Sequence, residues 1–374
     1  WVNDYEPIVA WVKCKLGDSS EGWSPYGNWT GDHDDLARPY IVDKNIRIKK
    51  TDIAETMSIQ AALEDIRSIL RNPGKSVRLT GLSGVGKTRF AQALFEEIGY
   101  GPLPQELALY VDFQKPIRMF PMEMVKELLA KKHRKIVIVD NCAATEHHEL
   151  TRLCKSPKST VSLLTIEYDV QDGEPEDSEV YQMLPSSNEC IVDILKQRKF
   201  YKNDQDYNRI ALLAGGNARV AIVLAKATKK EKNLNELKDE ELFERIFWQK
   251  GKFDDSLYKT AEVCSLVYSF SINQNKEKTD EIRVLASLYD ISIRDMVRNV
   301  NRLYKRQIVQ KRSHWRAVLP HALANRLAKE ALENLGAEIV LETMNNSSNH
   351  MIRSFSKRMS FLHDSKEAQD IFDA

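Results

Sequence analysis

The chain has 374 residues and a formal net charge of +1, and 42% of its residues are hydrophobic and 29% charged. This length predicts two or three domains, and this composition is typical of a soluble globular protein. The nearly neutral charge excludes a general attraction to nucleic acid or to membrane surfaces. No apolar run approaches the roughly 20 residues that a membrane-spanning helix needs.

The cysteines are an odd, scattered set without a C-x-x-C pair: Cys14, Cys142, Cys154, Cys190 and Cys264. Such a set argues against a disulfide framework or a zinc site and is typical of a reducing compartment, so we expect a cytoplasmic protein. The sequence begins at Trp1 with neither Met nor a signal-peptide pattern. We therefore expect a fragment, or the ordered part, of a longer protein.

Residues 1–50 are predicted to be a linker. Their middle, "EGWSPYGNWTGDHDD", is rich in turn-forming residues, and its aromatic side chains indicate a linker that packs against a domain. A helix is then predicted over 51–72. Thr51 or Asp52 can cap its start, and Pro73 follows its end.

Strands and helices alternate in the next part, 51–187, which predicts an α/β domain with a parallel sheet. Runs of β-branched residues such as 136–139 are typical of strands that are buried on both faces. The predicted strands are 77–80, 107–113, 135–140, 161–166 and 179–184. The predicted helices between the first four strands are 87–98, 120–132 and 144–154.

The rest of the chain is predicted to be mainly helical. Residues 188–250 would form a helical lid with helices at 188–199, 205–214 and 217–229. Residues 251–335 would form a winged helix, with helices at 257–269, 279–288 and 292–305, strands at 306–310 and 315–319, and a helix at 320–334. Residues 336–374 would be a helical connector whose last helical segment covers 351–372.

The stretch "LTGLSGVGKTRF" contains Gly81-x-x-x-x-Gly86-Lys87-Thr88 between a predicted strand and a predicted helix. Glycines let the backbone turn so that its N–H groups point at phosphate oxygens, while Lys87 supplies a positive charge and Thr88 a hydroxyl for Mg²⁺. The pattern predicts ATP and Mg²⁺ as cofactors. The predicted contacts are Gly81, Ser83, Gly84, Val85, Gly86, Lys87, Thr88 and Arg89.

Asp140 ends the predicted strand "KIVIVD" and is the expected second magnesium ligand beside Thr88. The alternative is that Asp140 only caps the helix near 144. Related motor ATPases usually have a Glu in the next position, which acts as base for the attacking water. Asn141 stands there, and an amide cannot accept that proton, so we expect slow hydrolysis or another base.

Further candidates follow the next strand and open two helices. Thr165 can touch the γ-phosphate or the attacking water, and Glu167 is the nearest spare carboxylate for a stand-in base. Arg219 lies at a helix start, where a cation indicates an anionic partner, and His321 is a candidate phosphate sensor. The alternatives are an ordinary strand-end hydroxyl, a structural Glu, a surface Arg and a capping or core His.

A basic cluster lies on the third helix and the wing of the predicted winged helix: Lys305, Arg306, Lys311, Arg312 and Arg316. Winged helices contact DNA with these parts. Without a wider basic field, the cluster is also explained as an ordinary solvated surface.

Together these motifs resemble the STAND class of signalling ATPases, which are relatives of AAA+ proteins. Several strings resemble the bacterial antiviral STAND (Avs) group more closely. They are "VRLTGLSGVGKTR", "VDNC", "SLLTIEYDV", "GGNARVA", "LPHALANRLA" and "FSKRMSFLHDS", and they extend from about 77 to 364. The first is shared by many ATPases, and the last three are much more specific.

The resemblance implies an ATP-binding switch in antiphage defence. An N-terminal effector, often a nuclease, and a C-terminal helical-repeat sensor would both lie outside these residues, and DNA would be a substrate of the effector alone. The sensor of such proteins binds a phage protein of the terminase or portal type, after which protomers assemble, commonly as homotetramers. Nucleotide roles are implied for Lys87, Thr88, Asp140, Thr165 and Arg219. For His321 the match is loose.

Two other functions remain open at this point. A DNA-loading AAA+ ATPase of the replication-initiator type also joins this core to a winged helix, but it usually has a Glu after the strand-end Asp. A STAND transcription activator would have its DNA-binding domain outside these residues. Salt-dependent DNA binding by this chain would distinguish the DNA-loading ATPase from the switch.

Overall fold

The computed structural model divides into two compact units, Trp1–Gln197 and Arg198–Ala374. The residues that it describes are 22–27, 29, 38–50, 56–113, 117, 119–167, 178–201, 203–228, 234, 244–249, 252–272, 280–306, 308–312, 315–318, 321–363 and 365–373. Among these residues no helix is both long enough and apolar enough to span a bilayer.

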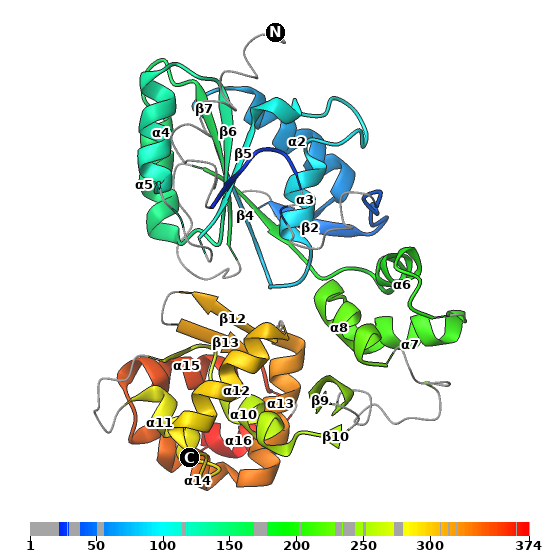
Figure 1. Ribbon diagram of the computed structural model, residues 1–374, viewed down its shortest axis with the longest axis vertical. Coiled ribbons are helices and arrows are strands. Elements are labelled where there is room, and N and C mark those ends of the chain that lie inside the picture. Colours follow the sequence, from blue (N-terminus) through cyan, green and yellow to red (C-terminus); the bar gives the residue numbers. More distant parts are fainter. Residues whose placement is uncertain are drawn as a thin grey trace. The chain divides into compact units, whose positions relative to one another are not determined.

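The first unit is built on an eight-stranded, mostly parallel sheet with the order β1-β5-β6-β7-β4-β8-β2-β3 (Figure 1). Its five central strands, from β5 to β8 in that order, are parallel. β1, β2 and β3 join antiparallel at the two edges. The strands are β1 Trp23–Ser24, β2 Ile46–Lys50, β3 Thr56–Ser58, β4 Ser76–Gly81, β5 Ala108–Asp112, β6 Lys135–Asp140, β7 Val161–Ile166 and β8 Glu179–Met183.

The five predicted strands of the sheet are therefore present and parallel. The chain is a mixed α/β protein, as predicted. The three edge strands were not predicted, because they are short and lie in or next to the predicted linker. Trp23 of β1 is fully buried and Trp29 is almost fully buried, so this part of the linker packs against the sheet as expected.

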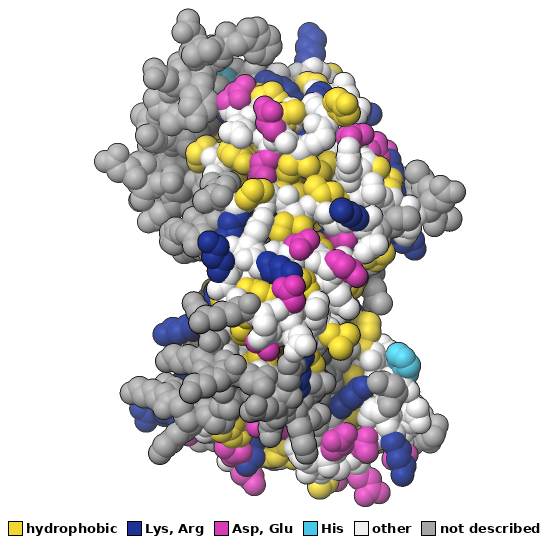
Figure 2. Space-filling view, turned by 90° about the vertical axis from the view of Figure 1, so that its right-hand side faces the viewer, with side chains coloured by type: hydrophobic (Ala, Val, Ile, Leu, Met, Phe, Trp, Pro, Cys, Tyr) yellow, Lys and Arg dark blue, Asp and Glu magenta, His cyan; other side chains and the backbone are white. Residues whose placement is uncertain are grey.

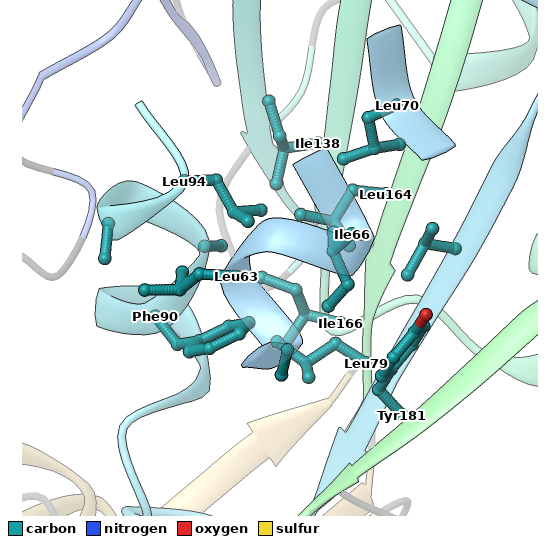
Figure 3. Close-up of a cluster of buried hydrophobic side chains, with 14 of the residues drawn as sticks. Leu63, Ile66, Leu70, Leu79, Phe90, Leu94, Ile138, Leu164, Ile166 and Tyr181 are labelled. Carbon is teal, nitrogen blue, oxygen red and sulfur yellow. The ribbon is translucent and has the colours of Figure 1, made fainter. Parts of the chain in front are cut away.

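Helices cover both faces of this sheet (Figure 1). On one face, α2 (Ile59–Arg71) and α3 (Lys87–Ala93) pack over a buried apolar core, which Figure 3 shows. On the other face, α4 (Pro121–Ala130) and α5 (Ala144–Cys154) cover a second core. The first face is called the α3 face below, and the second the α5 face. α6 (Asn188–Gln197) follows β8 at the end of the unit.

The predicted start of the first helix was wrong. Residues 56–58 form β3, and α2 begins after Ser58, whose hydroxyl accepts a hydrogen bond from the amide of Ala61. A serine cap of this kind satisfies an amide that the first turn leaves unpaired. Of the predicted helix start, 51–55 lie outside the described residues.

α3 ends five residues earlier than predicted, at Ala93. The buried guanidinium of Arg67 on α2 explains this end, because it donates to the carbonyls of the turns that follow. Its acceptors are Ala93, Leu94, Glu96, Ile98 and Tyr100, at 2.6 to 3.2 Å. A charged side chain thus replaces the hydrogen bonds that a longer helix would make.

The second unit opens with α7 (Asp204–Ala214) and α8 (Ala218–Thr228), separated by Gly215 in a left-handed conformation. A short hairpin follows, with β9 Trp248–Gln249 and β10 Lys252–Phe253. Next come α10 Asp255–Ser265, β11 Phe270–Ser271, α11 Glu281–Ser287, α12 Ile293–Lys305, β12 Val309–Arg312, β13 Trp315–Val318 and α13 His321–Leu335. The last three strands form a sheet of order β11-β13-β12.

Three more helices complete the chain: α14 Ala337–Asn345, α15 Asn349–Met359 and α16 Lys366–Asp373. The helical segment predicted over 351–372 consists of two helices, α15 and α16. Ser365 lies at the start of α16, and its hydroxyl accepts from the amide of Ala368. Cys142, Cys154, Cys190 and Cys264 are free and buried, and Cys14 lies outside the described residues.

Candidate functional site

The loop between β4 and α3 depends on glycine. Gly81, Gly84 and Gly86 all have positive φ, and Gly86 directly precedes α3. A Cβ on Gly81 would lie 2.4 Å from the backbone oxygen of Met183 on β8, whereas one on Gly86 would meet nothing within 4 Å. The loop therefore starts against the neighbouring strand, where only glycine fits. A glycine-rich turn between a parallel strand and a helix is the arrangement of a phosphate-binding loop.

Lys87 opens α3 and is 8% exposed. Its amino group donates to the carbonyls of Gly81 and Leu82, at 2.7 and 2.9 Å. Ser83 and Val85 of the same loop are also buried, and the carbonyl of Val85 accepts from the guanidinium of Arg47. The charge of Lys87 is thus held against the loop that the sequence predicts to bind phosphate.

Asp140, at the end of β6, lies next to Thr88, 52 positions earlier in the chain. The Thr88 hydroxyl donates to Oδ2 of Asp140 at 2.7 Å, and the Tyr110 hydroxyl donates to the same oxygen at 3.0 Å. The backbone amide of Asn141 donates to Oδ1 at 2.9 Å. Burial and the neighbouring Asp112 raise the pKa of Asp140, and the hydroxyls of Thr88 and Tyr110 oppose that rise. The structure therefore brings both predicted metal ligands together.

A hydroxyl and a carboxylate suit Mg²⁺, which prefers oxygen ligands and is usually held by one or two protein groups together with phosphates and water. Within the described part of the chain, no group of three or more His, Cys, Asp or Glu side chains is placed to hold a metal by itself. Thr88 and Asp140 thus fit a magnesium ion that arrives with a nucleotide, and they do not form a complete protein cage.

Asn141 has a left-handed backbone, with φ of 57°. Its side-chain amide donates to Oδ1 of Asp112 at 2.8 Å, and Asp112 is the residue of β5 that lies beside Asp140 in the sheet. Asn141 has no carboxylate of its own, but it donates to the carboxylates that end two neighbouring strands, Asp140 on β6 and Asp112 on β5.

Thr165 lies on the α5 face, whereas Asp140 lies on the α3 face. In the parallel register Thr165 is beside Val139, and alternate residues of a strand point to opposite faces. The Thr165 side chain is fully buried and shares a hydrogen bond of 2.6 Å with Nδ1 of His147 on α5. The structure therefore does not bring Thr165 together with Thr88 and Asp140.

Glu167 follows β7 and is 3% exposed, and its amide donates to the carbonyl of Leu79 on β4. Its backbone is thus fixed at the end of β7, the strand next to β6. The guanidinium of Arg89 forms an ion pair with both carboxylate oxygens of Glu96. Its contact with a nucleotide stays a prediction.

Arg219 and His321 belong to the second unit. Asn217 caps α8, since its side-chain oxygen accepts from the amides of Arg219 and Val220. The side chain of His321 lies outside the described residues, although α13 does begin at this residue. Their roles at the loop stay predictions.

Sequence reasoning missed Tyr110 and Asp112, which reach Asp140 and Asn141 from β5. Trp29 of the linker stacks on the ring of Tyr110, with centroids 4.8 Å apart. One signal was available for Asp112, because "LALYVDF" has an acid next to its end, much as "KIVIVD" ends in one. No comparable signal marks Tyr110, whose contact depends on the pairing of β5 with β6.

No protein-family model matches the chain, and no curated protein matches its sequence. Among solved structures it is similar to the STAND protein PH0952 of Pyrococcus horikoshii, which has a tetratricopeptide repeat sensor. The identity is 12% and the TM-score 0.36, and the match covers 89% of this chain and 56% of that one. This chain thus spans little more than half of that protein.

Two further similar structures are the RuvB Holliday junction branch migration motor of Thermotoga maritima and the Walker-type ATPase PABY2304 of Pyrococcus abyssi. The first is 13% identical with a TM-score of 0.36, covering 74% of this chain and 94% of that one. The second is 11% identical with a TM-score of 0.37, covering 76% and 99%. Similarity this low does not show a function.

Proposed function

We propose that this chain binds ATP with Mg²⁺ and acts as a nucleotide-controlled switch. The observation that carries the proposal is the meeting of Lys87, Thr88 and Asp140 at one end of the sheet. Lys87 would exchange two neutral carbonyl acceptors for phosphate oxygens, which are stronger partners for an ammonium group. The loop amides and the start of α3 would contribute further positive potential.

Bound magnesium would neutralise charge on the β- and γ-phosphates. Thr88 and Asp140 would hold it, and Tyr110 would keep the Asp140 carboxylate in place. Hydrolysis is expected to be slow, because Asn141 stands where related motors have a catalytic Glu. Slow hydrolysis suits a switch, in which the bound nucleotide sets the conformation and its loss resets it.

The finer assignment is to the antiviral STAND (Avs) group. In this proposal 188–250 form a lid, 251–335 a winged helix and 336–374 a connector toward a C-terminal sensor. The order helix, strand, two helices, two strands in the second unit supports the winged helix. Binding of a phage protein by the sensor would allow protomers with bound ATP to assemble into homo-oligomers, with tetramers as the expected form. Assembly would activate an N-terminal effector through the linker of residues 1–50.

Arg219 and His321 would contribute to that switch from the lid and the winged helix. In this proposal each would contact the phosphates of the bound nucleotide. Arg219→Ala is therefore expected to leave folding intact and to weaken ATP-driven assembly. Mass photometry with ATP would measure this, and normal oligomers would remove Arg219 from the mechanism.

A DNA-loading ATPase is less well supported. Of the basic cluster on α12 and the wing, Arg316 is 4% exposed and Arg306 donates to the carbonyl of Ile246. On the face drawn in Figure 2, basic and acidic side chains are interspersed and do not form a field of one sign. DNA affinity that falls steeply with salt would nevertheless favour that function.

The experiment for the proposed function compares ATP binding by the unsubstituted chain, Lys87→Ala and Lys75→Ala, using calorimetry with Mg²⁺. Lys75 is an exposed lysine just before β4 and is the matched control. Lys87→Ala should weaken binding at least about tenfold, because a charge-assisted contact of 1.5 kcal/mol or more is lost. Lys75→Ala should bind normally. Equal affinity of all three proteins would refute the phosphate-loop assignment.

A further inference from the structure

Asp112 is the second carboxylate at the end of the sheet that holds the candidate nucleotide site. It is the last residue of β5 and lies beside Asp140 in the register of parallel strands. Tyr110, two residues earlier, points to the same face and reaches Asp140 with its hydroxyl. The side chain of Asp112 therefore lies on the α3 face, next to the proposed magnesium ligand.

Asn141 fixes the orientation of this carboxylate. The left-handed backbone at Asn141 accompanies a side chain that reaches β5, and its amide donates to Oδ1 of Asp112 at 2.8 Å. Asn tolerates this conformation better than most residues. A carboxylate has about four acceptor positions, and the Asn141 amide occupies one of those on Oδ1. Asn141, which stands in the place of the usual catalytic Glu, thus fixes the carboxylate of Asp112.

Other carboxylates are less suited to the role. Asp140 already accepts hydrogen bonds from the hydroxyls of Thr88 and Tyr110 on one oxygen and is the proposed metal ligand. Glu167 is 3% exposed and follows β7, while Asp112 is half-buried and accessible to water. A hydrolytic base must reach a water molecule that has entered from solvent.

We propose that Asp112, positioned by Asn141, is the hydrolytic base of this chain. The proposal rests on the proposed function. The oxygen of a water molecule attacks the γ-phosphorus of ATP, and the bond between that phosphorus and the β–γ bridging oxygen breaks. Asp112 takes the proton from the water, the bridging oxygen leaves on ADP with the bonding electrons, and inorganic phosphate forms. The proton on Asp112 then returns to solvent.

The test uses the whole chain and four variants: Asp112→Asn, Asp112→Glu, Asn141→Ala and Glu167→Gln. Two readouts are compared, single-turnover hydrolysis of ATP and the nucleotide found on the protein after denaturation. Asp112→Asn should bind ATP normally, hydrolyse it about 100-fold more slowly or worse, and retain ATP where the unsubstituted chain retains ADP. Asp112→Glu should recover part of the rate, which a merely structural role would not allow.

Asn141→Ala should slow hydrolysis less than Asp112→Asn, because it removes the positioning group and leaves the carboxylate. Glu167 is the rival carboxylate, and Glu167→Gln should slow hydrolysis far less than Asp112→Asn does. A normal rate for Asp112→Asn, a large loss for Glu167→Gln alone, or no hydrolysis by the unsubstituted chain that binds ATP would overturn the inference. Failure of the unsubstituted chain to bind ATP would instead overturn the proposed function from which it starts.

Discussion

Polar side chains near the strand ends have different surroundings on the two faces of the sheet. On the α3 face, the end of β6 gathers Thr88 and Tyr110 around Asp140. On the α5 face, the end of β7 gathers His147 and, through it, Ser178 around Thr165. The first set lies beside the glycine loop, and in the second set Thr165 and His147 are buried under α5. A polar residue at a strand end is thus a ligand candidate only if it points to the face of the loop.

Substitutions of Asp140 and Thr165 should have opposite effects on hydrolysis and stability. Asp140→Ala should lower magnesium-dependent hydrolysis at least about 100-fold, because it removes a metal ligand from the transition state. Thr165→Val should leave ATP binding and hydrolysis unchanged but lower the free energy of unfolding by about 1–3 kcal/mol, since buried His147 loses a partner. Hydrolysis assays and urea unfolding of both variants would measure this. Loss of hydrolysis in Thr165→Val would place it in the site.

A second effect belongs to the α5 face alone. Burial lowers the pKa of His147 to about 3, with nearby Arg78 and His148 adding to the shift. An unfolded His titrates near 6.5, so below that pH the unfolded chain binds more protons than the folded one. Stability is therefore complete above about pH 6.5 and falls as the pH falls toward 3.

Between pH 7.5 and 5.0 His147 should account for a loss of about 2 kcal/mol in the free energy of unfolding. Urea unfolding at both pH values would measure it. His147→Gln should show a correspondingly smaller pH dependence, because Gln does not titrate. An unchanged pH dependence in that variant would show that His147 is not held neutral by the fold.

Substitution of Tyr110 on the α3 face should have a smaller effect. Tyr110→Phe removes one donor to Asp140 and should cost about 0.5–1.5 kcal/mol of stability. It should also raise the magnesium concentration needed for half-maximal ATP binding. Tyr181→Phe is the matched control, because this buried tyrosine of β8 donates to Asp65 and does not contact Asp140. Equal magnesium dependence of the two variants would remove Tyr110 from the site.

Much of the central sheet could be predicted because its strands are long, apolar and separated by helices. The glycine loop and Asp140 were predictable for the same reason, since each is placed by a strand end. The face on which Thr165 lies could not be predicted, because it depends on the register in which β7 pairs with β6. A register shift of one residue would have moved Thr165 to the α3 face.

Other features depend on contacts between distant segments. Arg67 ends α3 through five carbonyls that lie 26 to 33 positions away in sequence. Tyr110 and Asp112 acquire their roles only when β5 pairs with β6. β1 and β3 have two and three residues, too few for an alternating pattern to be recognised in sequence.

A structure of the chain with Mg²⁺ and a non-hydrolysable ATP analogue would show whether the glycine loop binds nucleotide. We expect a metal ion between the Thr88 hydroxyl and Asp140, with the Lys87 amino group moved from the loop carbonyls to the phosphates. Thr165 should stay bonded to His147. A nucleotide bound away from the loop, or a metal held without Thr88 and Asp140, would contradict the account.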